Sequence, residues 1–539
     1  MTASKRKDKG LAGYAIILVL CVFTKYIMLH HRGENNSLQL YLTNFVFVYL
    51  FALMIFYTLF KTVTRMVYYR KMRDQYRNAA QMIHSGFILS FILSLICIGG
   101  MFFLSPRITI HLFKMDGYGR ATYLVFAGTT LLLFACAVLS GWFSGFRILS
   151  RIHPAILIFS ISDLLFSLTF MIIATNKGKI HAALLHDELI VSAFASLGAA
   201  LGLAFSLFLT FVWIVVMTFH YKRKLSNHIE VDYSRLEESV FQQIFAMFYG
   251  ILTPFSEGII MFGFFIFNTW LYFTRTLEEA PYQLYGAYLY DHLLWFVIFL
   301  IPTAVIAKRM ENPLFQCFKN GDRMQGGQRM LYTLKQFLAI VMPGIFVVFA
   351  IYPMLDSAFF GTESIPFSMR IWNTLFVTLF LIQLLLLYMC YACGKTNIQI
   401  LIGLGMFVLQ SVISLFLLHK NATIQMFLIC NLIFVLLLNL AYYLILYRKF
   451  CYRKRLIRHL VMPLASAVAA LVTAALCTFL RHIFGNLISS IIAMVLSFVV
   501  HSLAIVGTNC ISEQELREIP LQSLYLAIGQ RIGIYKRYR

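Results

Sequence analysis

The sequence predicts an all-α polytopic membrane protein with about 14 transmembrane helices, and two observations carry that prediction. First, 60% of the 539 residues are hydrophobic and only 12% are charged, whereas about 25% are charged in an average soluble chain. Second, apolar runs of 20 or more residues recur from one end to the other, and each is long enough to cross about 30 Å of hydrocarbon. The polar connections between the runs are too short to hold a soluble domain.

The expected spans are residues 11–30, 38–67, 84–105, 119–144, 153–174, 188–219, 241–273, 284–307, 334–360, 367–393, 396–418, 421–447, 459–482 and 484–508. The sixth and seventh are longer than the bilayer requires, so we expect them to tilt or to extend beyond it. The basic start SKRKDK leads directly into a full-length span, so no cleavable signal peptide is expected.

The formal net charge of +23 is explained by membrane topology rather than by nucleic-acid binding. Most Lys and Arg residues fall on alternate connections, the pattern that marks cytoplasmic segments. The pattern predicts a multi-pass protein of the cell membrane with both termini in the cytoplasm. Basic stretches such as RMVYYRKMRDQYR and YRKFCYRKRLIRH would also contact anionic membrane lipids.

Cofactor and metal motifs are not evident. The chain has ten cysteines, and none falls in an expected outer loop, so no disulfide framework is expected. The CYAC stretch at Cys390 and Cys393 is a single pair, which is weak evidence for zinc or redox chemistry. Without a phosphate-binding loop, energy would have to come from an ion gradient, the membrane potential or a partner protein.

A weak internal repeat predicts two lobes. SPRITIHLFKMDG and YPMLDSAFFG each carry a proline followed seven residues later by phenylalanine, and they close the third and the ninth span. An offset of six spans preserves orientation in the membrane, as in parallel repeats. We therefore expect two six-helix lobes, residues 1–225 and 226–455, then two C-terminal helices within 456–510. An amphipathic cytoplasmic tail, residues 511–539, would begin at the capping-box sequence SEQE.

The order of several stretches resembles the polysaccharide-exporter branch of the multidrug/oligosaccharidyl-lipid/polysaccharide (MOP) flippase superfamily, which includes stage V sporulation B-like proteins and lipid II flippases. TKYIMLHH resembles the first helix with its basic residue, and VTRMVYYRKMRDQYRNA resembles the end of helix 2. LSGWFSGFRILSRIHPAI, LYGAYLYDHLLWFVIFLIPTAVIAKRM and ISEQELREIPL resemble the turn between helices 4 and 5, helix 8, and the acidic helix after helix 14. One departure concerns helix 5, where Phe166 stands near the place of an expected arginine after Asp163.

The resemblance implies a flippase rather than an enzyme. In such proteins two lobes face each other across a central cavity that opens alternately to each side. The implied substrate is a saccharide linked to a polyprenyl pyrophosphate, and the last two helices would hold its lipid tail. The partners would be this lipid-linked saccharide, membrane lipids and, in the cell, polysaccharide-synthesis glycosyltransferases. No cofactor is implied.

Three basic residues are the candidate substrate-binding residues. Lys25 lies inside the first span, either reaching the interface by snorkelling or, as its family position implies, contacting a lipid-linked pyrophosphate. Lys61 and Arg65 are four residues apart and therefore share one face of a helix. They would either bind an anionic headgroup or anchor the helix at the cytoplasmic interface.

Two acidic residues are the candidate ion-coupling or cavity residues. Asp163 and Glu257 lie near the middle of their spans, where a carboxylate should face the protein interior. Asp163 would serve either in transport or as a structural hydrogen-bond acceptor. Glu257 follows Pro254, which should bend the helix, so Glu257 would be an ion or proton site or the partner of a buried cation.

Two other functions remain open at the level of sequence. A cation-coupled multidrug exporter of the same superfamily is one, although a lysine in the first helix disfavours cationic drugs. A membrane glycosyl- or acyltransferase is the other, although such enzymes need a chamber of converging acids, bases or nucleophiles. No catalytic residue and no metal ligand is assigned.

Overall fold

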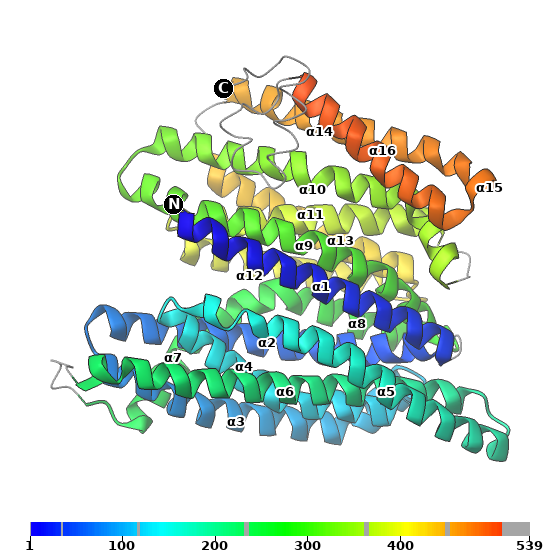
Figure 1. The fold of residues 1–539 in the computed structure, drawn as a ribbon, viewed down its shortest axis with the longest axis horizontal. Helices are drawn as coiled ribbons and strands as arrows, with labels where there is room; N and C mark the ends of the chain where they lie inside the picture. The colour runs from blue at the N-terminus through cyan, green and yellow to red at the C-terminus, as the bar shows by residue number, and fades with distance from the viewer. Residues whose placement is uncertain are drawn as a thin grey trace. The chain divides into compact units, whose positions relative to one another are not determined.

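The computed structural model describes residues 2–33, 36–115, 119–230, 237–360, 366–447 and 453–508. Throughout these ranges every regular element is a helix (Figure 1). Thirteen helices in the described part are long and apolar enough to cross a membrane. The prediction of an all-helical polytopic membrane protein is therefore confirmed. Each candidate span overlaps an expected one, although Tyr76–Leu112, Leu149–Leu185 and Arg323–Phe360 extend well beyond the expected bounds.

The eighth expected span, residues 284–307, is not among these thirteen and lies on helix α9 (Pro281–Lys319). The described part of α9 contributes only a shorter apolar stretch, Ile298–Ala307. The expected tail, residues 511–539, lies outside the described residues.

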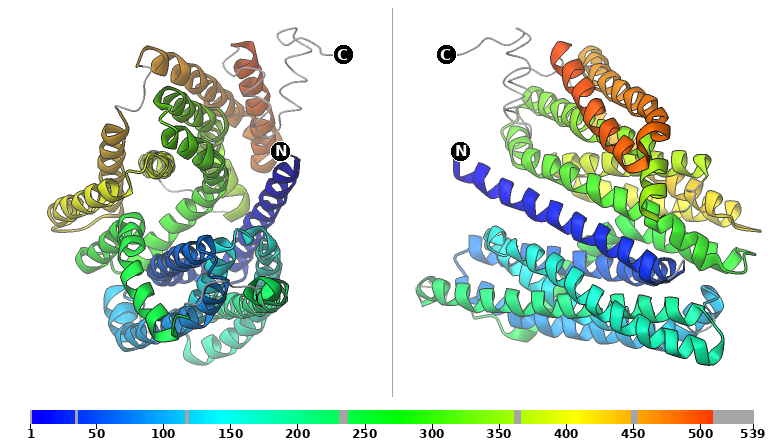
Figure 2. Two further views of the ribbon diagram at one scale, coloured as in Figure 1. Left: turned by 90° about the vertical axis from the view of Figure 1, so that its left-hand side faces the viewer. Right: turned by 45° about the vertical axis from the view of Figure 1, so that its right-hand side comes forward.

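The helices group into two compact units (Figure 2). The first unit comprises Met1–Asp291 and Phe407–Cys430, and the second comprises His292–Met406 and Asn431–Arg539. The expected boundaries of the lobes, at residues 225 and 455, stay a prediction.

Eight of the described α-helices lie wholly within the first unit: α1 (Thr2–Arg32), α2 (Ser37–Met72), α3 (Tyr76–Pro106), α4 (Arg120–Gly145), α5 (Pro154–Leu185), α6 (Leu189–Glu230), α7 (Val240–Gly258) and α8 (Phe264–Arg275). Short helices extend or link them: η1 (Arg107–Leu112), η2 (Leu149–Arg151) and η3 (Ile259–Gly263). The later helices are α9, α10 (Arg323–Phe360), α11 (Phe367–Ala392), α12 (Thr396–Leu417), α13 (Ile424–Tyr447), α14 (Arg453–Cys477), η4 (Thr478–Leu480), α15 (Arg481–Phe484) and α16 (Asn486–Gly507).

Glycines allow the helices of the first unit to approach closely. On α4, an added Cβ at Gly141 would lie 2.8 Å from the Phe60 carbonyl oxygen, and one at Gly145 would lie 2.6 Å from the Val67 Cβ. On α6, an added Cβ at Gly202 would lie 2.3 Å from the Ser167 Cα of α5. Small residues spaced four apart let helix backbones pack at short range in membranes, so α2–α4 and α5–α6 form tightly packed pairs.

The seventh span is not one continuous α-helix. Pro254 lies inside α7, where it cannot donate a backbone hydrogen bond. The span then passes through η3, a π-helix, before α8 begins at Phe264. Such π-segments interrupt regular helix packing and occur often near functional positions.

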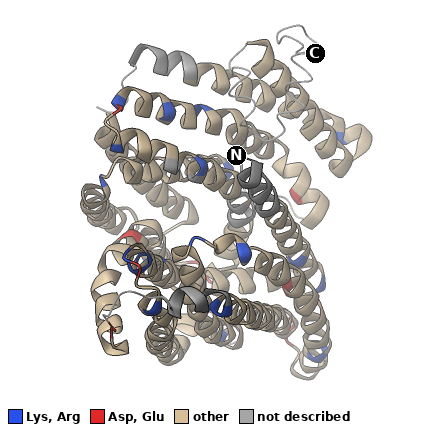
Figure 3. Ribbon diagram, turned by 60° about the vertical axis from the view of Figure 1, so that its left-hand side comes forward, with Lys and Arg blue, Asp and Glu red and all other residues tan. Residues whose placement is uncertain are grey.

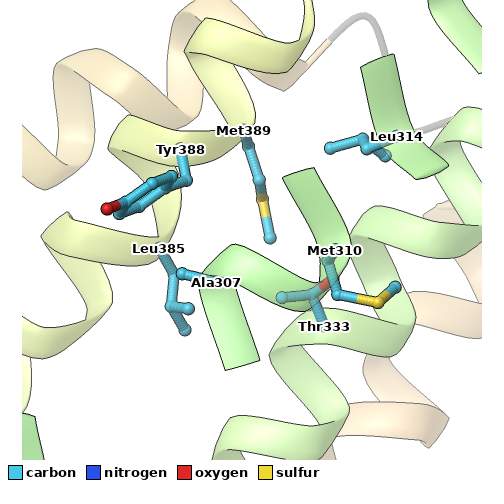
Figure 4. Close-up of a pocket in the computed structure, with 7 residues that line it drawn as sticks. All are labelled: Ala307, Met310, Leu314, Thr333, Leu385, Tyr388 and Met389. Atoms are coloured by element: carbon cyan, nitrogen blue, oxygen red, sulfur yellow. The ribbon is translucent and has the colours of Figure 1, made fainter. Parts of the chain in front are cut away.

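In the second unit, a core of small residues joins three helices. Ala467, Ala470 and Ala474 of α14 are fully buried, as is Ala493 of α16, and both helices also pack against α10. A small pocket elsewhere in this unit is lined by Ala307, Met310, Leu314, Thr333, Leu385, Tyr388 and Met389 (Figure 4). Its lining is mostly apolar and uncharged, so we interpret it as imperfect packing.

Candidate functional site

Charged residues occupy few positions along the helices (Figure 3). In the first unit, the five residues singled out from the sequence form two separate clusters. Lys25 and Asp163 belong to one cluster, and Lys61, Arg65 and Glu257 belong to the other. Ionisable residues inside a membrane-spanning bundle are costly unless they are paired, and they often mark functional sites.

The Lys25–Asp163 cluster joins α1, α2 and α5. The Lys25 Nζ lies 2.9 Å from Asp163 Oδ1 and 3.1 Å from Oδ2, and it donates a third hydrogen bond of 2.9 Å to the Tyr41 hydroxyl. Ser167, one turn after Asp163, donates to Asp163 Oδ1 at 3.0 Å and also lies 3.1 Å from the Ala199 carbonyl oxygen of α6. Lys25 and Asp163 are 2% and 4% exposed.

These contacts exclude the snorkelling interpretation of the Lys25 side chain, whereas its contact with a pyrophosphate stays a prediction. A snorkelling lysine would extend to the interface, but this ammonium group is buried against a carboxylate. Asp163 likewise faces the interior, as expected. Its cationic partner comes from α1 rather than from its own helix, where Phe166 packs against Phe170 and Phe205.

The second cluster, which we call the α2 basic stripe, consists of Tyr57, Lys61 and Arg65 facing Glu257 of α7. An Arg65 guanidinium nitrogen, Nη2, lies 3.4 Å from Glu257 Oε1. The Tyr57 hydroxyl donates a hydrogen bond of 2.8 Å to Glu257 Oε2. The Lys61 ammonium lies 5.5 Å from the centroid of the Tyr57 ring, within cation–π range.

The two clusters differ in exposure. In the first, the Lys25 ammonium and the Asp163 carboxylate are both buried. In the second, the Glu257 side chain is 1% exposed, whereas the Arg65 side chain is 37% exposed. The α2 basic stripe therefore has a cationic side chain, Arg65, that remains accessible.

Sequence reasoning missed the hydroxyl partners of both clusters. Tyr41, Tyr57 and Ser167 donate to, or accept from, the ionisable groups. Their spacing held a signal: Tyr57, Lys61 and Arg65 follow one another at four-residue intervals, as Asp163 and Ser167 do. Side chains four residues apart are neighbours on a helix.

A further polar cluster fixes the beginning of α7 against α2 and α3. Arg70 pairs with Glu238 (Nε to Oε2, 2.8 Å), and the Glu238 backbone N–H donates to the Asn78 side chain at 3.1 Å. Ser85 donates to the buried Gln243 at 2.7 Å. This cluster holds the beginning of α7, the helix that carries Glu257, against α2 and α3.

Another buried network links α8 and α12. The Gln410 amide nitrogen lies 2.9 Å from Asn268 Oδ1 and 2.6 Å from Ser414 Oγ. All three residues are fully buried. Among the described residues, no group of three His, Cys, Asp or Glu side chains is placed to hold a metal ion.

Several solved transporter structures have folds similar to that of this chain. An inward-facing multidrug-resistance MATE transporter of the MOP superfamily aligns with a TM-score of 0.57 at 13% identity, over 81% of this chain and 94% of its own. The lipid II flippase MurJ, in an inward closed conformation, aligns with a TM-score of 0.57 at 10% identity, over 91% and 99%. The chain has the fold of MOP-superfamily transporters.

A eukaryotic MATE transporter is also similar, with a TM-score of 0.56 at 14% identity, over 86% of this chain and 99% of its own. No protein-family profile matches the chain, and no curated protein matches it in sequence. The superfamily fold expected from the sequence is thus confirmed, whereas identities this low do not distinguish the polysaccharide-exporter branch from the drug exporters.

Proposed function

We propose that the protein is a flippase that moves a polyprenyl-pyrophosphate-linked saccharide across the cell membrane by alternating access. The MOP fold supports a transporter rather than a glycosyl- or acyltransferase. We place both termini in the cytoplasm, because the basic connections then face inward. Glycosyltransferases that assemble the saccharide are the proposed partners in the cell.

The single observation that carries the substrate assignment is the α2 basic stripe. Lys61 and Arg65 lie on one face of α2, where Lys61 stacks over the Tyr57 ring and Arg65 is accessible beside the Glu257 carboxylate. Guanidinium and ammonium groups bind phosphate oxygens through strong, charge-assisted hydrogen bonds. A pyrophosphate carries enough negative charge to engage both cations, whereas an organic cation would be repelled by them.

Lys25 is proposed as a further headgroup contact, but only after its present hydrogen bonds are broken. Its ammonium is bound by Asp163 and Tyr41, so it could reach a phosphate only after giving up contacts within the cluster. We therefore assign first contact with the headgroup to Lys61 and Arg65. Asp163 and Glu257 are the proposed ion-coupling or cavity residues.

A transport assay tests this function. The purified protein, reconstituted in liposomes, should transfer a fluorescent polyprenyl-pyrophosphate disaccharide between leaflets, and the Lys61→Gln/Arg65→Gln variant should transfer it much more slowly. The two proteins are compared at equal protein density, and protein-free liposomes are the control for passive leakage. Equal rates for the two proteins would contradict the proposal.

The second candidate is a cation-coupled multidrug exporter. It is favoured by the similarity to a multidrug MATE transporter, whose TM-score equals that of the lipid II flippase. The neutral Lys25–Asp163 pair also removes one positive charge that would disfavour a cationic drug. Export of an organic cation from the same liposomes, without transfer of the lipid-linked sugar, would favour this candidate.

A further inference from the structure

Helix α16 carries polar side chains on the face that packs inside the second unit. Ser489, Ser497 and His501 are buried, and they are spaced by multiples of four residues, so they lie on one face of the helix. Ala493, on the same face, belongs to a buried cluster with residues of α10 and α14. Polar groups inside a membrane-spanning bundle are costly and often mark functional sites.

A proline in α10 provides the hydrogen-bond acceptor for His501. Pro343 lies inside α10 and has no backbone N–H, so the Ala339 carbonyl, four residues earlier, lacks its usual helical donor. The His501 Nε2 lies 2.9 Å from that carbonyl oxygen. Because a carbonyl oxygen only accepts, Nε2 carries a proton and donates it to the hydrogen bond. The imidazole therefore links α16 to α10.

The other ring nitrogen of His501 can take up a proton. When Nε2 carries the proton of a neutral ring, Nδ1 is an acceptor. The Ser466 backbone of α14 lies close to the ring, but within the described part of the chain Nδ1 has no hydrogen-bond partner. The Ser497 hydroxyl, one turn earlier, is likewise buried and without a partner among the described residues. Buried polar atoms of this kind call for an explanation such as a bound water or ion.

A proton bound at His501 would lack a counter-charge. The described ionisable side chains on the elements packed against α16 are Arg323, Arg329, Tyr332, Lys335, Tyr352 and Asp356 of α10, Cys477 of α14, and Arg481 and His482 of α15. Lys335 lies one turn from Ala339 and is itself a cation. Asp356 is the one carboxylate among them, and it lies about 25 Å further along α10. A buried charge without a partner is strongly unfavourable.

We propose that His501 is a proton-binding site of the second unit, and that binding a proton there separates α16 from α10. The proton adds to the lone pair of Nδ1 and gives an imidazolium with an N–H on each nitrogen. Because the packed state offers this charge no carboxylate, the protonated protein favours a conformation in which water reaches the ring. Proton uptake is thereby linked to movement of α16, whatever substrate the protein carries.

The test measures the distance between α10 and α16 in the purified full-length protein in detergent. Spin labels are attached through genetically encoded ketone amino acids at Met324 of α10 and at Thr508, which directly follows α16; both positions are exposed. Double electron–electron resonance then reports the distance between the labels. As the pH falls from about 8 to about 5, the range in which histidines take up protons, the population at longer distance should rise several-fold.

Three variants identify the group that responds. His501→Gln keeps an N–H donor for the Ala339 carbonyl but does not titrate, so the distance should stay at its high-pH value throughout. His482→Gln removes an exposed histidine of the same unit and should respond as wild type does. Pro343→Ala introduces an N–H that competes with His501 for the Ala339 carbonyl, so the midpoint of the response should move to higher pH. It provides a second reading if His501→Gln does not fold.

Three outcomes would overturn the inference. A wild-type distance that is the same at both ends of the pH range would show that no proton moves α16. A response of His501→Gln equal to that of wild type would assign the proton to another group. A long distance at every pH in His501→Gln would make the histidine a structural link between the helices and nothing more.

Discussion

The two charged clusters of the first unit use the same chemistry in opposite ways. Lys25 and Asp163 are joined by two short contacts and further held by Tyr41 and Ser167, and neither is more than 4% exposed. Arg65 and Glu257 share one long contact, and the arginine is open on one side. The first cluster is buried, whereas the second leaves Arg65 accessible.

The difference indicates which cluster can exchange partners. Removing one member of a buried ion pair leaves an uncompensated charge, which is strongly destabilising. A partly exposed pair contributes little to stability, so a ligand can replace one member at small cost. The Lys25–Asp163 cluster is therefore expected to support the packing of α1 against α5, while the α2 basic stripe is expected to exchange its carboxylate for a phosphate.

The largest expected loss of stability comes from changing the buried Lys25–Asp163 cluster. Asp163→Ala should destabilise the protein by about 3–5 kcal/mol, because it leaves the Lys25 ammonium buried without a counter-charge. The double variant Lys25→Met/Asp163→Leu should recover most of the loss. Thermal unfolding of the detergent-solubilised protein measures both. An Asp163→Ala variant as stable as wild type would show that the buried Lys25–Asp163 pair does not stabilise the fold.

The next largest loss of stability is expected where Gly202 of α6 packs against Ser167 of α5. Gly202→Ala should cost about 1–3 kcal/mol through overpacking, because the new methyl group meets the backbone of Ser167, which donates to Asp163. Gly128→Ala is the matched control, since an added Cβ there meets nothing within 4 Å. Equal melting temperatures for the two variants would contradict the close approach of α5 and α6.

The Tyr41 hydroxyl, which accepts a hydrogen bond from Lys25, should contribute less to stability. Tyr41→Phe removes one of the hydrogen bonds to the ammonium and should destabilise by about 1 kcal/mol. Tyr69→Phe, at a position that is 62% exposed, should have no measurable effect on unfolding. A loss at Tyr41 as large as that of Asp163→Ala would mean that the hydroxyl, not the carboxylate, satisfies Lys25.

The smallest effect on stability is expected in the α2 basic stripe. Arg65→Gln should change the free energy of unfolding by less than about 1 kcal/mol, yet it should weaken farnesyl pyrophosphate binding at least tenfold. Arg107→Gln, an exposed position on η1, is the control for general loss of positive charge. Strong destabilisation by Arg65→Gln would show that the pair is structural after all.

The sequence predicted the helices well and the pairing of charges poorly. Long apolar runs have few alternatives to spanning a membrane, which is why the bounds of most spans were close. In contrast, the sequence placed Lys25 and Asp163 138 residues apart with no local signal that joins them. Such pairs depend on how α1 and α5 pack against each other, and the hydropathy of each helix does not determine that packing.

The same limit applied to Glu257. The sequence left open whether it binds an ion or partners a buried cation, and the structure places Arg65 and Tyr57 beside it. The four-residue spacing on α2 did identify Lys61 and Arg65 as one face. What it could not supply was the carboxylate from α7 opposite that face, because this depends on how α7 packs against α2.

The most direct test of the account is a comparison of transfer rates in liposomes for the two neutralised clusters. Per folded protein, Lys61→Gln/Arg65→Gln should lose most transfer of a polyprenyl-pyrophosphate disaccharide, and Lys25→Met/Asp163→Leu should be slowed less. The account would be contradicted if the first variant transferred the lipid-linked sugar at the wild-type rate, or if only the second were inactive.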